Sequence, residues 1–153
     1  MFKQMQKIIL FSFFIFFNLS EYSLSKDEYF RTLRNDKVNL RQGPSFEYPV
    51  KIFYKKKFLP VLIQDSSDNF RKIRDHENNS GWIHISQLSK KKAAIVIDDQ
   101  LILFNKSSIY SMPSVILKKG RLCKIIKCRD NWCKIKVDKY KGWVKKNGLW
   151  GLL

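Results

Sequence analysis

The sequence predicts an all-β protein in which an N-terminal export signal precedes two tandem small β-barrels. Three observations support this prediction. An apolar segment is confined to the first 25 residues, a unit of about 60 residues occurs twice, and short apolar or alternating stretches are separated by turn residues. No segment after residue 25 shows sustained helical periodicity. We therefore divide the chain into residues 1–25, 26–90 and 91–153.

Residues 1–25 have the three parts of a secretory signal peptide. Lys3 and Lys7 provide a positive start, 8–19 is an almost unbroken apolar run, and Ser23 and Ser25 are small residues two apart. The run is shorter than the roughly 20 residues that span a bilayer as a helix. A buried core helix and an uncleaved membrane anchor are the alternatives. We predict cleavage after Ser25, export to the periplasm or cell envelope, and no transmembrane span in the mature chain.

The remaining sequence contains the same pattern twice. The segment 69–73 reads NFRKI and is followed by GWI at 81–83, while 131–135 reads NWCKI and is followed by GWV at 142–144. The first pair of segments is offset by 62 residues and the second pair by 61. A unit of this size buries little apolar surface by itself, so we expect the two copies to pack together.

Each copy is predicted to consist of short antiparallel strands. In the first copy, polar residues 75–80 separate two strands and form a hairpin loop. In the second copy, apolar and polar residues alternate over 132–137, as in a half-buried strand. The predicted strands are 58–63, 70–74 and 81–85 in the first copy, and 122–127, 132–137 and 142–144 in the second. Gly81 and Gly142 stand where close backbone approach or a bulge is expected.

The sequence also resembles a known family. Residues 38–45 read VNLRQGPS, Tyr48-Pro49-Val50 follows, and Trp82 lies in a GWI motif that recurs as GWV around Trp143. These motifs resemble bacterial Src-homology-3-like domains, and the chain resembles small exported proteobacterial proteins with two such domains in tandem. The resemblance covers nearly all of 26–153 and implies a barrel of five to six strands per copy and a role in binding the cell wall or envelope. In the second copy Leu103-Phe104-Asn105 replaces the Asn-Leu-Arg motif, so a ligand role of that loop is not expected there.

The three cysteines lie close together in the second copy. Cys128 and Cys133 enclose four residues that include Asp130 and Asn131, which predicts a hairpin turn with the cysteines on facing strands. Such a pair can oxidise outside the cytosol, and the resemblance implies a disulfide between them. We expect Cys123 to be a small buried strand residue.

Catalysis, metal binding and cofactor binding are not expected. No Gly-x-Ser-x-Gly nucleophile elbow occurs, and the two repeats occupy all of 26–153. His76 and His84 have no further ligands at suitable spacing, and the cysteines form no paired C-x-x-C motifs.

Loop aromatics are the candidate ligand contacts. In Src-homology-3 folds ligands lie against aromatic side chains on one side of the barrel, which for this sequence implies the residues Arg41, Phe46, Tyr48, Tyr54 and Trp82. Core packing is the alternative for the aromatic residues, and we favour it for Trp82 and Trp143.

The chain is strongly basic, with a formal net charge of +17, which predicts anionic partners. The excess is concentrated in the second copy, where we predict a basic face formed by Lys124, Lys134, Lys136, Lys145 and Lys146. The composition of an A+T-rich genome, which favours lysine codons, is the alternative explanation.

Together these observations predict a non-enzymatic, exported binding module of the bacterial cell envelope. Its expected partner is peptidoglycan or another anionic envelope polymer. The alternatives are a periplasmic protein–protein adaptor that uses the groove between the barrels and, third, a nucleic-acid-binding small barrel. Because an exported protein rarely meets nucleic acid, we expect no nucleic-acid partner.

Overall fold

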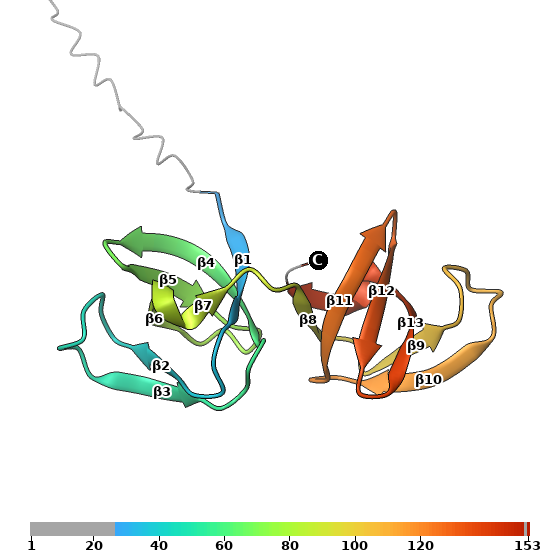
Figure 1. The fold of residues 1–153 in the computed structure, drawn as a ribbon, viewed down its shortest axis with the longest axis horizontal. Coiled ribbons are helices and arrows are strands. Elements are labelled where there is room, and N and C mark those ends of the chain that lie inside the picture. Colours follow the sequence, from blue (N-terminus) through green and yellow to red (C-terminus); the bar gives the residue numbers. More distant parts are fainter. Residues whose placement is uncertain (1–26, 152) are drawn as a thin grey trace, which may run out of the picture.

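The structure, a computed structural model, describes residues 27–151 and 153 (Figure 1). The predicted signal peptide therefore lies outside the described residues. The described chain forms two seven-stranded antiparallel sheets, which appear as two lobes joined by a short connection (Figure 1). This confirms the predicted all-β fold with two tandem domains. Within the described part of the chain, no helix is long and apolar enough to cross a membrane.

The two sheets have the same topology. The first has the order β3-β2-β6-β5-β4-β1-β7, and the second has the order β10-β9-β13-β12-β11-β8-β14. Each strand of the second sheet thus takes the place of the strand seven numbers earlier, as the sequence repeat requires. The first sheet consists of β1 (Tyr29–Leu33), β2 (Val38–Arg41), β3 (Val50–Tyr54), β4 (Pro60–Ser67), β5 (Phe70–Arg74), β6 (Ser80–His84) and β7 (Leu88–Ser89), with the 3-10 turn η1 (Ile85–Gln87) before β7. The second consists of β8 (Ala93–Val96), β9 (Gln100–Phe104), β10 (Pro113–Lys118), β11 (Leu122–Arg129), β12 (Trp132–Val137), β13 (Tyr140–Lys145) and β14 (Leu149–Gly151), with η2 (Lys146–Gly148) before β14.

Alternating residues of each sheet form its core. The first core includes Leu40, Ile73 and Ile83, and the second includes Leu103 and Ile135. All five are fully buried. The strand prediction was accurate for β5 and β12, whereas Phe58 lies before β4 rather than in it.

Two glycines bring neighbouring strands unusually close. A Cβ atom added to Gly81 would lie 2.6 Å from the carbonyl oxygen of Arg41, and one added to Gly142 would lie 2.6 Å from that of Phe104. Each glycine therefore allows β6 or β13 to approach β2 or β9, which is the close approach that the sequence predicted.

The two barrels pack against one another. Ile95 of β8 belongs to the core cluster of the first barrel, and Leu122 of β11 packs against that cluster. Phe30 of β1 and Trp150 of β14 make an edge-to-face contact, with ring centroids 4.9 Å apart. The second barrel thus completes the core of the first.

Candidate anion-binding surfaces

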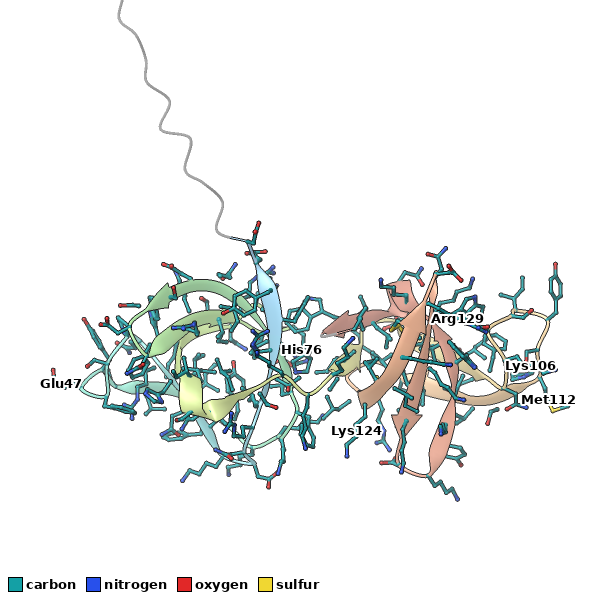
Figure 2. The ribbon with its side chains drawn as sticks, turned by 45° about the horizontal axis from the view of Figure 1, so that its top comes forward. Glu47, His76, Lys106, Met112, Lys124 and Arg129 are labelled. Carbon is teal, nitrogen blue, oxygen red and sulfur yellow. A yellow bond between two sulfur atoms is a disulfide. The ribbon has the colours of Figure 1, made fainter. Side chains whose placement is uncertain are left out.

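The outer face of β11, β12 and β13 carries a cluster of cations. Cross-strand pairing arranges nine residues in three rows, and directly paired residues of antiparallel strands project to the same side of the sheet. The rows are Arg129–Trp132–Lys145, Lys127–Lys134–Trp143 and Lys124–Lys136–Lys141. We call these nine residues the basic array. Seven of them are cations, none is acidic, and Figure 2 shows Lys124 and Arg129 toward opposite ends of β11.

Two tryptophans organise the cations of the basic array. The Trp143 ring is 6% exposed, and Arg129, Lys127 and Lys134 place their charged groups 4.7, 5.8 and 5.9 Å from its centroid. The Lys145 ammonium lies 4.4 Å from the centroid of the Trp132 ring. Cation–π attraction holds these side chains in place. The cations nevertheless repel one another, and no described carboxylate lies within 4.0 Å of them.

The first barrel provides an internal comparison for the basic array. Its nine equivalent positions are Ser67–Phe70–His84, Asp65–Lys72–Trp82 and Leu62–Arg74–Ser80. An aromatic residue remains at both tryptophan positions, but only two of the nine are lysine or arginine and one is acidic. Both barrels belong to one chain and one genome. Genome composition therefore does not explain why only the second barrel has this array.

The basic array contains most of the predicted basic face. Lys124, Lys134, Lys136 and Lys145 belong to it, whereas Lys146 lies beyond the rows, in η2. Sequence reasoning did not assign Lys127, Arg129 and Lys141 to the face. A register shift between Ile125 and Lys127 lets Lys124 and Lys127, three residues apart, project to the same side. Simple alternation along β11 does not reveal this.

Three of the predicted ligand residues meet on the loop between β2 and β3. Arg41 Nη1 donates hydrogen bonds to the carbonyl oxygens of Phe46 at 3.0 Å and Tyr48 at 2.8 Å. Phe46 is 63% exposed, and its ring packs against Phe70 and His84. This loop includes Glu47, which lies at the end of the first barrel that points away from the second (Figure 2).

Glycine shapes the same loop, and Trp82 lies beside it. The Tyr48 ring covers Gly43 so closely that an added Cβ would lie 2.6 Å from ring carbons. Trp82 pairs with Arg41 across β2 and β6 and is half-buried. Arg41, Phe46, Tyr48 and Trp82 therefore form one surface, which we call the loop platform.

The structure corrects the prediction for Tyr54. This residue is 8% exposed in the core, and its hydroxyl donates a 2.8 Å hydrogen bond to Asp75 Oδ2. Burial, followed by the contact with Asp75, raises the pKa of Tyr54 well above its usual range. Tyr54 therefore supports the barrel from inside and is not available to a ligand on the loop platform.

The cysteines are placed as structural residues. Cys128 and Cys133 are direct partners across β11 and β12 and are joined by a disulfide. Cys123 is a free, buried thiol whose Sγ donates to the Ala94 carbonyl oxygen at 3.2 Å. Burial raises the pKa of the Cys123 thiol to about 12, so little reactive thiolate exists at neutral pH.

The two histidines lie apart from any metal-binding cluster. Among the residues that the structure describes, no three His, Cys, Asp or Glu side chains gather closely enough to hold a metal ion. His84 Nδ1 lies 2.7 Å from the Ser86 hydroxyl and accepts from the Ser86 amide at the start of η1. His76 lies near Glu77 and Trp150.

The groove between the barrels is basic. Its central residue, Phe58, lies within 5.1 to 5.6 Å of the ammonium groups of Lys57, Lys91 and Lys124. Lysines also line two cavities beside Phe58, of about 370 and 420 Å³. Through Lys124 the groove is continuous with the basic array.

Comparison with known proteins identifies the family of these two barrels. Among solved structures, the chain is similar to NlpC2 and NlpC1 from Trichomonas vaginalis, each at 13% identity and a TM-score of 0.37, covering 81% and 83% of this chain and 48% and 47% of theirs. It is also similar to an NlpC/P60 family protein from Bacillus cereus, at 10% identity and a TM-score of 0.37, covering 80% of this chain and 56% of the other. The chain thus spans about half the length of these proteins, and no curated protein sequence matches it significantly. The family model of the bacterial SH3 domain matches residues 34–90 and 107–151, and the chain therefore belongs to the bacterial SH3 domain family, with one copy in each barrel.

Proposed function

We propose that this protein is a non-enzymatic binding module of the bacterial cell envelope, and that it holds an anionic envelope polymer on the basic array. Peptidoglycan, whose stem peptides carry carboxylates, is the polymer that we expect. The main support is that seven of nine positions are cationic in the second barrel, against two in the first.

The geometry of the basic array suits an extended polymer better than a single small anion. Residues two apart on one strand are separated by roughly 7 Å and adjacent strands by about 4.8 Å. The positions on β12 and β13 therefore form a grid, and β11 adds a third row of positions in which the bulge widens one step. A chain of anionic groups that crosses this grid would relieve the repulsion among the cations around Trp143 at several points at once.

The basic groove favours this proposal over a protein adaptor. An adaptor that uses the space between the barrels would be supported by an apolar groove, but lysines surround Phe58 there. A second anionic segment could continue from the basic array through Lys124 into this groove.

Co-sedimentation with isolated cell-wall sacculi tests the proposal. The chain from Lys26 onward would be compared with a double charge reversal in the basic array, Lys134→Glu with Lys136→Glu. The matched control is Lys72→Glu with Arg74→Glu at the equivalent positions of the first barrel, which changes the net charge equally. We expect the array variant to lose at least tenfold in retention at moderate salt, and the control to lose less than twofold.

Two results would contradict the proposal. If both variants lose retention equally, retention depends on net charge alone, because the two variants have the same charge and differ only in which barrel carries the change. Absence of retention of the unaltered chain at every salt concentration would exclude peptidoglycan as the partner.

A further inference from the structure

A pocket in the first barrel belongs neither to the basic array nor to the loop platform. It lies between β1, β5, η1 and β7 and has a volume of about 660 Å³, within the range of small-molecule sites. Its lining residues are Tyr29, Arg31, Arg34, Arg71, Ile85, Leu88, Ser89, Lys90 and Lys91. Five of these nine are cationic and none is acidic, so we call it the arginine pocket.

Two of the arginines start from the inner face of the barrel. Arg31 is the direct partner of Val61, and Arg71 is the direct partner of Ile83. Val61 and Ile83 are fully buried, so the side chains of both arginines leave the strands on the core side. Placing a cation there costs free energy unless an anion or hydrogen-bond acceptors compensate for the lost water.

The second barrel shows that the fold does not need these arginines. There Ala94, the partner of Cys123, stands in place of Arg31, and Cys133 stands in place of Arg71. Both of these residues are fully buried, and the Cys128–Cys133 disulfide fills the position with apolar atoms. The two positions are thus small and apolar in the second copy and cationic in the first.

Backbone contacts hold the three guanidinium groups at the pocket wall. Arg31 Nη1 donates to the Phe30 carbonyl oxygen at 2.9 Å, and Arg34 Nε donates to that of Leu88 at 3.0 Å. Arg71 Nη1 donates to the carbonyl oxygens of Asp68 and Phe70 at 2.9 and 2.7 Å. These contacts use only some of the five N–H donors of each guanidinium.

The guanidinium groups have no carboxylate partner within the described chain. No described carboxylate lies within 4.0 Å of Arg31, Arg34 or Arg71. Asp27 and Asp65 line a smaller cavity of about 120 Å³, to which Arg71 and Tyr29 also contribute. The arginines are therefore held in place with N–H donors to spare and with no ion pair to a described carboxylate.

We propose that the arginine pocket binds a small organic oxyanion. Carboxylate or phosphate oxygens would accept from the arginine N–H groups, since the planar guanidinium matches both anions with two parallel hydrogen bonds. The carbon skeleton of the ligand would lie against Tyr29, Ile85 and Leu88. This site goes beyond the proposed function, because it lies in the other barrel and shares no residue with the basic array.

Calorimetric titration of the chain from Lys26 onward tests this site, with inorganic pyrophosphate and citrate as probes at constant ionic strength. Two variants change the inner face of the barrel: Arg31→Ala, which introduces the residue found at the equivalent position 94, and Arg71→Ala. The third variant, Arg34→Ala, changes an exposed side chain. Controls are Arg74→Ala, on the outer face of the same strand as Arg71, and Lys106→Ala, which changes an exposed residue of the loop between β9 and β10. We expect saturable binding of at least one probe, a Kd raised at least tenfold by each pocket variant, and less than a twofold change in the controls.

The two probes distinguish the two ligand chemistries, because the tighter one identifies a phosphate or a carboxylate ligand. If neither probe binds saturably, or if Arg74→Ala and Lys106→Ala weaken binding as much as the pocket variants do, the proposal is overturned. A thermal melt of each variant verifies that it is folded, and Arg34→Ala decides the outcome if the inner-face variants unfold. Retention on sacculi depends on the basic array, so failure here is distinguishable from failure of the proposed function.

Discussion

Asp75 anchors a polar loop to the core of the first barrel. Its carboxylate accepts from the Tyr54 hydroxyl, the Glu77 and Asn79 amides and the Asn79 side chain, at 2.8 to 2.9 Å. A buried carboxylate needs such partners. At the equivalent positions of the second barrel, Leu117 and Val137 are buried apolar residues. The Tyr54–Asp75 pair therefore serves the longer loop of the first barrel rather than the fold in general.

We predict that Tyr54 makes the protein less stable at high pH. Because burial and Asp75 raise the pKa of Tyr54, the folded state keeps its phenol proton above the pKa of about 10 at which the unfolded chain releases it. This stabilisation is fully present below about pH 10 and declines by about 1.4 kcal/mol per pH unit as the pH rises above it.

Urea unfolding of the unaltered chain and of Tyr54→Phe between pH 8 and 11 measures this effect. The variant is expected to be about 1 kcal/mol less stable at pH 8, because it removes one hydrogen bond to Asp75. The difference should shrink and then reverse above pH 10. If the free energies of unfolding of the two proteins change with pH in parallel, Tyr54 has the same pKa in the folded and unfolded states, and the prediction is wrong.

At the scale of elements, the β11–β12 hairpin sets the register of the basic array. Asp130 is the first residue of the two-residue turn between Arg129 and Trp132 and adopts a φ of 48°. The favoured two-residue hairpin turns need a positive φ at this position. The Cys128–Cys133 disulfide then joins the two strands one step from that turn. The corresponding hairpin of the first barrel, β4–β5, has Ser66 and Arg71 as partners at that position instead.

Removal of the disulfide is expected to destabilise the protein by about 2 kcal/mol, because a loop this short restricts the unfolded chain only modestly. The measurement is the urea midpoint of Cys128→Ser with Cys133→Ser, compared with the unaltered chain with and without reductant. The urea midpoint of the reduced chain should approach that of the variant, whereas reductant should not change the midpoint of the variant. Cys123 is free and buried and is expected to remain unreactive in every folded sample. If reductant leaves the midpoint of the unaltered chain unchanged, the disulfide does not contribute to stability.

At the scale of the whole molecule, each barrel has its own core, and the second barrel adds apolar side chains to the core of the first. Ile95 and Leu122 of the second barrel extend the core of the first, and Trp150 closes the junction against Phe30. The Lys91 ammonium also lies over the ring of Phe58 beside this junction. Phe58 adopts a φ of 64°, which is unusual for an aromatic residue. Small domains gain stability from such shared burial, so the barrels should unfold together.

Trp150→Ala tests this coupling. We expect the unaltered chain to unfold in one transition and the variant to unfold in a broader or two-step transition. The variant should lose about 2 kcal/mol in free energy of unfolding. This is less than the roughly 3–5 kcal/mol lost when a fully buried aromatic residue is replaced by alanine, because Trp150 is only half-buried. Urea unfolding followed by fluorescence and circular dichroism measures both effects. Phe53→Ala, which removes an exposed aromatic residue of β3, is the control and should leave a single transition. Two transitions already in the unaltered chain would show that the barrels fold independently.

The strands that could be predicted have a strong local pattern. The alternation over 132–137 matched β12, and the apolar residues Phe70 and Ile73 marked β5. By contrast β1 carries Arg31 on its inner face and β8 is buried throughout, so neither shows alternation. Their pairing with β4 and β11 forms these strands, and that pairing joins segments far apart in the sequence.

The repeat, the all-β class, the family and the concentration of charge in the second copy could be predicted before the fold was known, because each depends on residue types and local spacing. Which side chains share a surface could be seen only in the folded molecule. Lys127 projects into the basic array because of a bulge in β11, and Tyr54 is buried in the core instead of lying at the candidate site. Arg31 and Arg71 line one pocket although they are 40 residues apart in the sequence. The physical reason is that the face and neighbours of a strand residue depend on cross-strand register, which is set by contacts between distant parts of the chain.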